Sequence, residues 1–289
     1  MTFQLMTDSG ADLSARMKTE WGIKVVPLFV HFGEQQYASE QLTTAVFLKK
    51  LKESSQFPSS SAPGPHEYHQ AFKAIEPTKP IIHISISSGV SSSYNHAIMG
   101  RDMLLEEEPN RKIVIIDSKS ASTGMMLLIN EALTKMAENL SFEQISIHLA
   151  ERVNHLRTLF VLQSLDNLIR GGRLDKVKGA VAKTLNVKLI LHASSEGKIE
   201  VLEKVRGNKK ATRRFIEKIG EYVSRTSNQT LAMTHCNAAD RLEEFSTKLK
   251  DTYSFEQILT AETGPVISAH AGQGAIVISF FSDHSRNND

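Results

Sequence analysis

Apolar runs alternate with amphipathic stretches along the first half of the chain. Four short runs rich in β-branched or aromatic residues predict buried strands at 3–6, 24–32, 80–85 and 112–116. Between them, apolar residues recur at helical spacing and predict helices at 13–21, 42–52, 66–75, 94–107, 122–139 and 142–155. Strands that alternate with helices in this way favour a mainly parallel sheet with helices on both faces.

The second half of the chain has shorter elements in a less regular order. Strands are expected at 158–163, 187–192, 199–205, 230–234, 255–260 and 275–281, with a turn at 194–197. Helices are expected at 177–185, 209–226 and 239–253, together with a short helix at 165–174 that Gly171 and Gly172 interrupt. Residues 282–289 have the composition of a frayed tail.

This pattern predicts an α/β protein with two α/β domains. Residues 1–157 are expected to form an N-terminal domain with a mainly parallel sheet flanked by helices. Residues 158–289 are expected to form a smaller C-terminal α/β domain with a mixed sheet.

Composition narrows the functional class. Of 289 residues, 40% are hydrophobic and 23% are charged, which predicts a sizeable packed core. The net charge of +2 provides no electrostatic footprint for a nucleic acid partner. The single cysteine, Cys236, excludes a disulfide framework and a cysteine zinc site. The start of the chain lacks a signal-peptide pattern, and no apolar run approaches the roughly 20 residues of a membrane span, so a cytoplasmic location is expected.

The most distinctive stretch is 84–96, with the sequence I-S-I-S-S-G-V-S-S-S-Y-N-H. A buried strand here runs into small hydroxyl residues and a glycine, and a helical pattern follows. Open α/β sheets bind ligands at the carboxyl ends of their strands, and a helix start at that edge favours anions. The stretch therefore predicts the anion-binding end of a small-molecule site.

Part of the same stretch suggests a hydrolase. Residues 89–93, G-V-S-S-S, resemble the nucleophile elbow G-x-S-x-G without its last glycine. A serine hydrolase or esterase that uses Ser91 and His270 is therefore an alternative hypothesis. Structural roles also remain open, since Ser91 could cap a helix and His270 could be a structural histidine.

Other polar residues have simple structural interpretations. Ser60 and Ser61 lie in the proline-rich stretch 57–65 and could be turn residues. Asp8 and Asp117 follow predicted strands and are interpreted as groups that cap and brace loops. No second carboxylate accompanies either of them in the pattern of a metal site, so no metal is expected.

Six motifs together resemble the DegV family in order and spacing. They are T-D-S at 7–9, S-S-A-P at 60–63, S-S-G-V-S at 87–91, D-S-K at 117–119, L-x-x-L-x-x-G-G-R-L at 165–174 and G-P-V-I-S-A-H at 264–270. The resemblance implies two α/β domains that bind one long-chain fatty acid in a buried tunnel between them, without catalysis and without a cofactor. It also implies the role of the fatty-acid-binding subunit of bacterial fatty acid kinase. Such a subunit presents the acyl carboxylate to a separate ATP-dependent kinase, which makes an acyl phosphate for phospholipid synthesis.

The resemblance also implies the residues that bind the carboxylate. They are Ser60, which replaces the threonine usual in the family, Ser91 and His270, with Ser61 and Ser92 in support. Ala62 replaces the usual glutamine, and Ser92 replaces the usual glycine. Hydroxyl groups and an imidazole N–H are donors that suit a carboxylate, and protonation of His270 would make the contact charge-assisted.

The acyl chain is expected to supply most of the affinity, because each buried methylene contributes ~0.8 kcal/mol. Its lining must be apolar, and the candidates Phe29, Met99, Leu165 and Ile267 cannot be told from ordinary core residues in the sequence.

Arg206 follows a predicted strand and matches an arginine with which the family engages the kinase. The neighbouring cationic residues Lys209, Lys210, Arg213 and Arg214 are interpreted as the solvated face of a helix. The expected partners are thus a long-chain fatty acid and an ATP-dependent fatty acid kinase. No nucleic acid partner is expected, and transient contact with a membrane surface is compatible with this role. A third hypothesis is a fatty-acid-responsive interaction protein without a kinase partner.

Overall fold

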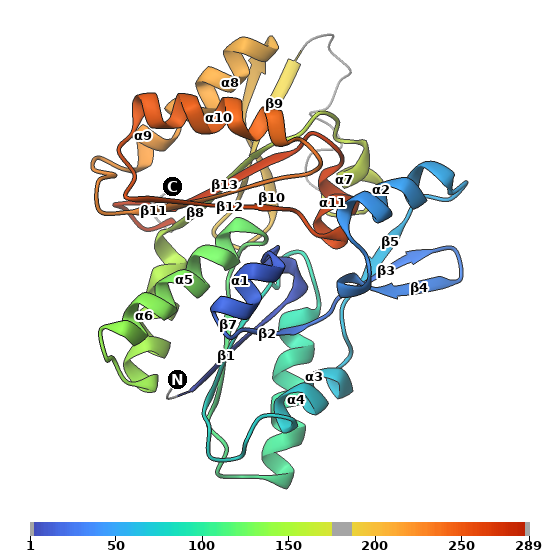
Figure 1. The fold of residues 1–289 in the computed structure, drawn as a ribbon, viewed down its shortest axis with the longest axis vertical. Helices are drawn as coiled ribbons and strands as arrows, with labels where there is room; N and C mark the ends of the chain where they lie inside the picture. Colours follow the sequence, from blue (N-terminus) through green and yellow to red (C-terminus); the bar gives the residue numbers. More distant parts are fainter. Residues whose placement is uncertain (1–2, 175–186, 287–289) are drawn as a thin grey trace.

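Two sheets and a small third sheet organise the chain in the computed structural model, which describes residues 3–174 and 187–286. The helix expected at 177–185 lies outside the described residues. Figure 1 shows the sheet of the N-terminal half below, the sheet of the C-terminal half above, and the small sheet to the right of both. Helices cover the outer faces of the two large sheets.

The N-terminal sheet is fully parallel. Its four strands follow the order β2 (Lys24–Val26), β1 (Gln4–Asp8), β6 (Ile81–Ser85) and β7 (Ile113–Asp117). The two central strands, β1 and β6, are buried along their whole length, as expected for a parallel sheet that is covered on both faces.

Two pairs of helices cover this sheet. The pair on one face is α3 (Pro65–Lys73) and α4 (Ser93–Glu107), and the pair on the other is α5 (Thr123–Ala137) and α6 (Phe142–His155). The short helix α1 (Ala15–Glu20) follows the 3-10 turn at Ser9–Ala11. The predicted N-terminal architecture, a parallel sheet flanked by helices, is confirmed.

The C-terminal sheet is mixed, as predicted. Its strand order is β10 (Ile199–Arg206), β9 (Val187–Ala193), β8 (Leu156–Val161), β13 (Ile276–Phe281), β11 (Thr230–His235) and β12 (Gln257–Glu262). Only the β11–β12 pair is parallel among the described strands of this sheet. Helices α8 (Asn208–Glu217), α9 (Ile219–Tyr222) and α10 (Ala239–Thr252) cover one face, while α5 packs against the other.

The prediction of a single strand at 24–32 is wrong, because two strands occupy this range. The chain leaves the parallel sheet at Val26 and forms β3 (Phe29–Phe32), which pairs with β4 (Gln35–Ala38) and β5 (Ser59–Ser61) in the third sheet. Pro27 has no N–H for a ladder, and the N–H of Leu28 donates to the Ser9 hydroxyl at 2.9 Å. A 3-10 turn (Ser39–Gln41) and helix α2 (Thr44–Glu53) follow β4.

Two expectations for the C-terminal half are also corrected. The helix expected at 209–226 breaks at Lys218 and ends at Tyr222, because Val223 adopts an extended conformation that buries its side chain. The tail predicted to be frayed, 282–289, is ordered as far as the structure describes it, up to residue 286. Arg286 is only 4% exposed, and its guanidinium donates to the carbonyl oxygens of Lys119, Val153 and Ser194.

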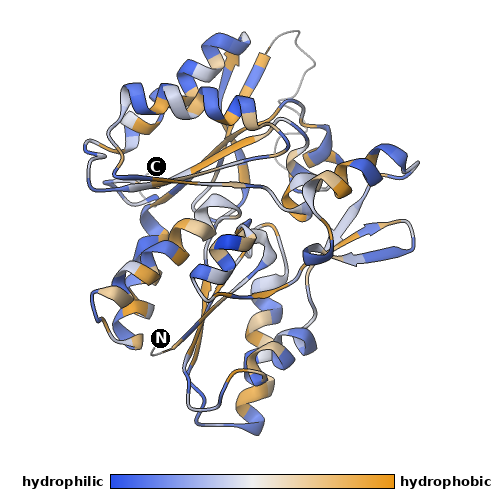
Figure 2. Cartoon of the chain, viewed as in Figure 1, coloured by the Kyte–Doolittle hydropathy of each residue, from blue (hydrophilic) through white to orange (hydrophobic). Residues whose placement is uncertain are grey.

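Figure 2 shows how hydropathy follows the layers. Apolar residues concentrate on the strands and on the inward sides of the helices, whereas α8 and the outer side of α2 are mainly hydrophilic. Within the described residues, no helix is long and apolar enough to cross a membrane.

One residue of the core, His83, is a buried histidine whose protonation is unfavourable. His83 lies in the middle of β6 with no exposed surface, and its ring meets the edges or faces of Tyr68 and Phe72 at centroid distances of 5.4 and 5.6 Å. Neither ring nitrogen has a hydrogen-bond partner among the described residues. Burial therefore lowers the pKa of His83 from 6.5 to about 3.

This histidine should make the fold acid-sensitive. Because the folded pKa of about 3 lies below the unfolded value of 6.5, the unfolded chain binds more protons and stability falls as the pH drops below 6.5. Between pH 7 and pH 5, wild-type protein should lose about 2 kcal/mol of unfolding free energy that His83→Phe retains. Urea unfolding at the two pH values measures this difference, and an unchanged pH dependence in the variant would contradict it.

Candidate functional site

Two buried or half-buried carboxylates hold the loop that follows β6. Asp8, at the end of β1, accepts hydrogen bonds from the Ile86 N–H at 2.8 Å and the Ser85 hydroxyl at 3.2 Å. Asp117, at the end of β7, accepts from the N–H and the hydroxyl of Ser88. Burial raises the pKa of Asp8 to about 6 despite these donors. The predicted loop-bracing role of both aspartates is confirmed.

Ser91 lies in this loop, just before helix α4. Its N–H donates to the carbonyl oxygen of Ser87 at 3.1 Å, and its hydroxyl pairs with the Ser93 hydroxyl at 2.9 Å. The Ser93 N–H also donates to the Ser91 hydroxyl, so Ser91 does contact the start of the helix. Ser92 is exposed and makes no side-chain capping bond.

His270 lies on a helix that the sequence pattern does not predict, α11 (Pro265–Ala271). Gly264 precedes this helix and Pro265 is its first residue, where the fixed proline φ suits a helix start. The Nε2 atom of His270 lies 2.8 Å from the hydroxyl oxygen of Ser60 on β5. The structure therefore joins two of the predicted carboxylate contacts directly, although 210 positions separate them.

The other side of the His270 ring meets Gly171, which follows α7 (Asp166–Arg170). A Cβ on Gly171 would lie 2.3 Å from the Nδ1 atom of His270, so only glycine leaves room for the ring. Nδ1 is buried and has no partner in the described part of the chain. Burial, and secondarily the charge of Arg173, lower the pKa of His270 to about 4. The imidazole is therefore neutral at pH 7, and the charge-assisted contact considered from the sequence is not favoured.

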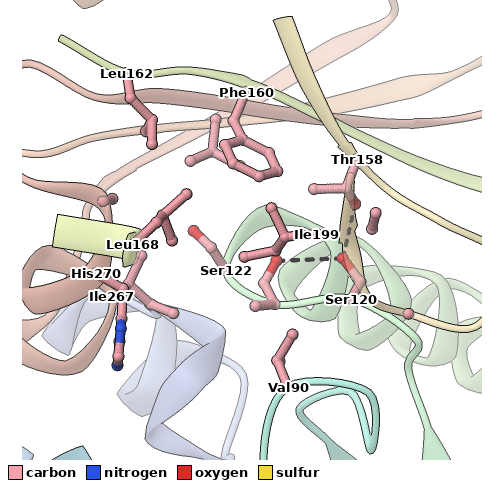
Figure 3. A pocket seen from close by; sticks show the side chains of 15 residues that line it. Val90, Ser120, Ser122, Thr158, Phe160, Leu162, Leu168, Ile199, Ile267 and His270 are labelled. Carbon is pink, nitrogen blue, oxygen red and sulfur yellow. Dashed lines mark hydrogen bonds between the residues drawn. The ribbon is translucent and has the colours of Figure 1, made fainter. Parts of the chain in front are cut away.

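Two cavities meet at His270. One has a polar wall made by Ser60, Ser61, Ser91 and Arg173. The other is almost entirely apolar and lies against the C-terminal sheet, where Phe160, Leu168 and Ile199 point toward one another (Figure 3). Both cavities share five lining residues, Val90, Ala121, Ile199, Ile267 and His270. The arrangement can accommodate a molecule with an anionic end and an apolar body.

Arg173 is a site residue that the sequence reasoning missed. Its guanidinium donates to the carbonyl oxygens of Gly171 at 2.6 Å and Val90 at 3.3 Å, and it lines the polar cavity. No Asp or Glu occurs among the described residues that line this cavity. The sequence feature that could have indicated this role is the charged residue directly after two glycines in the 165–174 motif.

The remaining predicted residues lie in different places. Ser61 lines the polar cavity, and its hydroxyl pairs with the Nε2 atom of His31 at 2.8 Å. Arg206 is exposed at the end of β10 and lines neither cavity. Of the candidate lining residues, Ile267 lines both cavities, whereas Met99 is 53% exposed on α4.

Two candidates, Phe29 and Leu165, line neither cavity. The described residues contain no group of three or more His, Cys, Asp or Glu side chains placed to hold a metal ion.

Comparison with known proteins identifies the family. The DegV family model, described as "Uncharacterised protein, DegV family", matches residues 2–283. The chain belongs to the DegV family. A DegV domain-containing protein of Streptococcus pyogenes serotype M1 is 32% identical over 285 residues, which cover 97% of this chain and 99% of that protein. The resemblance drawn from the six motifs is confirmed.

Solved structures of similar proteins show the same fold. A DegV family protein from Ruminococcus gnavus, refined with vaccenic acid, has a TM-score of 0.90 at 27% identity and covers 96% of this chain and 99% of its own. The fatty acid kinase (Fak) B3 protein of Streptococcus pneumoniae, loaded with linoleic acid, has a TM-score of 0.85 at 25% identity. The match covers 98% of this chain and 100% of that protein. Both of these related proteins bind a fatty acid.

The contact between Gly171 and His270 gives a test of the site geometry. Gly171→Ala should displace the imidazole from its buried position, and the pKa of His270 should rise from about 4 toward 6.5 as the ring gains water. Titration of the imidazole resonances by NMR measures this change.

Gly172→Ala is the matched control. Gly172 has φ +71°, and a Cβ on it would meet no atom within 4 Å, so this variant should cost about 1 kcal/mol through backbone strain without moving His270. Equal pKa shifts in the two variants would contradict the assigned contact.

Proposed function

We propose that this DegV protein binds one long-chain fatty acid, with the acyl chain in the apolar cavity and the carboxylate in the polar cavity. The observation that carries this proposal is the meeting of the two cavities at His270, with donors on one side and hydrocarbon side chains on the other. The fatty acids bound by the Ruminococcus gnavus and Streptococcus pneumoniae relatives support the same ligand class.

The proposed carboxylate contacts are the hydroxyls of Ser60 and Ser91 and one N–H of His270. A carboxylate only accepts hydrogen bonds, and in the structure the Ser60 hydroxyl and the Nε2 atom of His270 are bonded to each other. This bond would open on binding, so that both groups donate to the carboxylate together with Ser91, from three different segments. The neutral His270 supplies one donor without a full charge, and Arg173 supplies the positive charge of this cavity. Ser61 supports the site through its neighbour His31 rather than through a separate contact.

We further propose that the protein is a carrier rather than an enzyme. It would present the bound carboxylate to a separate ATP-dependent fatty acid kinase, which forms an acyl phosphate for phospholipid synthesis in the cytoplasm. The likeness to a Streptococcus pneumoniae protein that is named for fatty acid kinase supports this partner. Loading of the fatty acid would involve transient contact with a membrane surface, and no cofactor is required.

The geometry does not favour the hydrolase alternative. The Nε2 atom of His270 pairs with Ser60, whereas the hydroxyl of Ser91 pairs with Ser93. A catalytic histidine also needs an acceptor that orients its second nitrogen, but Nδ1 of His270 has no partner among the described residues. Ser91 is therefore better interpreted as a hydrogen-bond donor than as a nucleophile.

Substitution of Ser91 should separate tail binding from presentation of the head group. A long acyl chain gains on the order of 10 kcal/mol from burial before ordering costs, so loss of one hydroxyl contact should weaken binding by only about tenfold. Phosphorylation by the cognate kinase should fall much further, because the carboxylate is no longer held in place. Native mass spectrometry measures the bound acid, and kinase assays with ATP measure turnover.

The controls for this experiment distinguish the competing functions. Wild-type protein expressed in bacteria should carry one uncleaved long-chain acid, and Ser146→Ala, a remote change on α6, should match it in both assays. Full kinase turnover by Ser91→Ala would argue against the proposed contact. A fatty acid that binds normally but is never phosphorylated by any cognate kinase would favour an interaction protein without a kinase partner.

Arg206 is the proposed contact with the kinase. Because this exposed side chain lies outside both cavities, Arg206→Ala should bind fatty acid as wild type does but lose kinase turnover. The matched control is Arg213→Ala, which removes another exposed arginine of the same basic segment, one that pairs with Glu217. Unchanged phosphorylation in Arg206→Ala would overturn this assignment.

A further inference from the structure

Two glycines bring the loop that carries Ser91 into backbone contact with the C-terminal sheet. A Cβ on Gly89 would lie 2.6 Å from the carbonyl oxygen of Glu196 and 2.8 Å from the backbone of Gly197. Gly197 has φ +72°, and a Cβ on it would lie 2.0 Å from the Ser87 hydroxyl oxygen. Since any side chain at either glycine would collide, the turn between β9 and β10 packs directly on the loop.

Ser87 lies at the centre of this contact. It has no exposed surface, and its hydroxyl donates to the carbonyl oxygen of Gly197 at 2.8 Å. Its own carbonyl oxygen accepts the N–H of Ser91 at 3.1 Å, and its N–H donates to the carbonyl oxygen of Ser120 at 2.8 Å. One residue thus contacts both the loop segment that positions Ser91 and the turn of the opposite sheet.

That turn is part of the wall of the apolar cavity. Ala193, Gly197 and Ile199 line the cavity from the β9–β10 hairpin, and Ile199 also lines the polar cavity. Strand β10 is at the edge of its sheet, with β9 as its only strand neighbour among the described strands. An edge hairpin has fewer ladder contacts than a central strand, so its position depends more on contacts at its turn.

A second residue, Arg286, also holds this turn. The guanidinium of Arg286 donates to the carbonyl oxygen of Ser194 at 3.4 Å, and also to the carbonyl oxygens of Lys119 at 3.2 Å and Val153 at 2.6 Å. The turn is therefore fixed to the N-terminal half by the Ser87 hydroxyl and by the C-terminal arginine.

We propose that Ser87 is a positioning residue that ties the wall of the acyl cavity to the loop carrying Ser91. The hairpin then holds the acyl chain while the same contact keeps the head-group loop in place. This inference rests on the proposed function, because it assigns Ser87 a role in retaining a fatty acid. Loss of its hydroxyl frees the hairpin, and the effect grows with the length of acyl chain that the hairpin covers.

The test compares the release of two fatty acids of different length. Wild-type and Ser87→Ala protein are loaded with radiolabelled stearic or octanoic acid, and transfer of the label to phosphatidylcholine vesicles gives the dissociation rate. Ser87→Ala loses the bond to the Gly197 carbonyl oxygen, which ties the hairpin to the loop, and the bond that the Ser87 hydroxyl accepts from the Gly89 N–H within the loop. It should release stearic acid about tenfold faster, which corresponds to the one bond lost to the hairpin, and octanoic acid at nearly the wild-type rate. General destabilisation would instead accelerate both acids equally.

Two further variants complete the test. Thr44→Val removes another buried hydroxyl that donates to a backbone carbonyl, that of Thr263, but it does not touch the hairpin and should release both acids as wild type does. Arg286→Gln loosens the same turn with Ser87 intact, so it should also accelerate stearic acid selectively and serves if Ser87→Ala does not fold.

Two outcomes would overturn the inference alone, and a third would overturn the proposed function as well. Equal acceleration of both acids, or no acceleration in both Ser87→Ala and Arg286→Gln, would remove the positioning role while leaving fatty acid binding in place. Failure of wild-type protein to bind either acid would overturn the proposed function itself, and this inference with it.

Discussion

A chain of buried hydroxyl groups joins the start of α5 and the loop before it to the C-terminal sheet, and the rest of the structure depends on it. Ser120 pairs with Thr158 at 2.7 Å, Thr158 with Ser279 at 2.8 Å, and Ser279 with Thr123 at 2.7 Å. All four side chains are buried, and Thr158 and Ser279 each take part in two of these bonds. Separation of the Ser279–Thr123 pair would leave the buried Thr123 hydroxyl without this partner, at a cost of about 1–3 kcal/mol. An apolar interface could slide, but these directional bonds fix the relative position of the sheets. The residues of the polar cavity come from both halves, so these bonds also fix their positions relative to one another.

The sequence was most informative where periodicity and burial agree. The apolar runs at 3–6, 80–85 and 112–116 are strands of the parallel sheet, because parallel strands that helices cover on both sides need apolar residues on both faces. The hairpin with its turn at 194–197 was also predicted correctly, since glycine and polar residues separate two alternating runs. The pattern failed at 24–32, where Pro27 ends one strand and a continuous apolar run conceals the change of sheet.

The candidate site was less accessible to such reasoning. No periodic signal brings Ser60 to His270, and only the resemblance to the DegV family suggested that they act together. Helix α11 was missed because its small residues lack an amphipathic stripe, and its boundaries come from a Gly-Pro start and Gly272 at its end. Arg173 was missed because an arginine in a polar stretch is typical of a surface residue until its neighbours in space are known. Tertiary contacts therefore decided the roles that local pattern left open.

The shortness of β5 has a consequence for how freely this part of the chain can change over evolution. Adjacent serines on this strand face different histidines, Ser60 toward His270 and Ser61 toward His31. Side chains on a strand alternate with a period of two, so a slip of one residue along β3 would put Ser59 or Ser61 in the place of Ser60 opposite His270. Insertions in the preceding loop can be absorbed outside the strand. A single deletion within 59–61 would instead turn serine side chains of the site to the opposite face of the strand. Length variation is thus tolerated outside the strand but not within it.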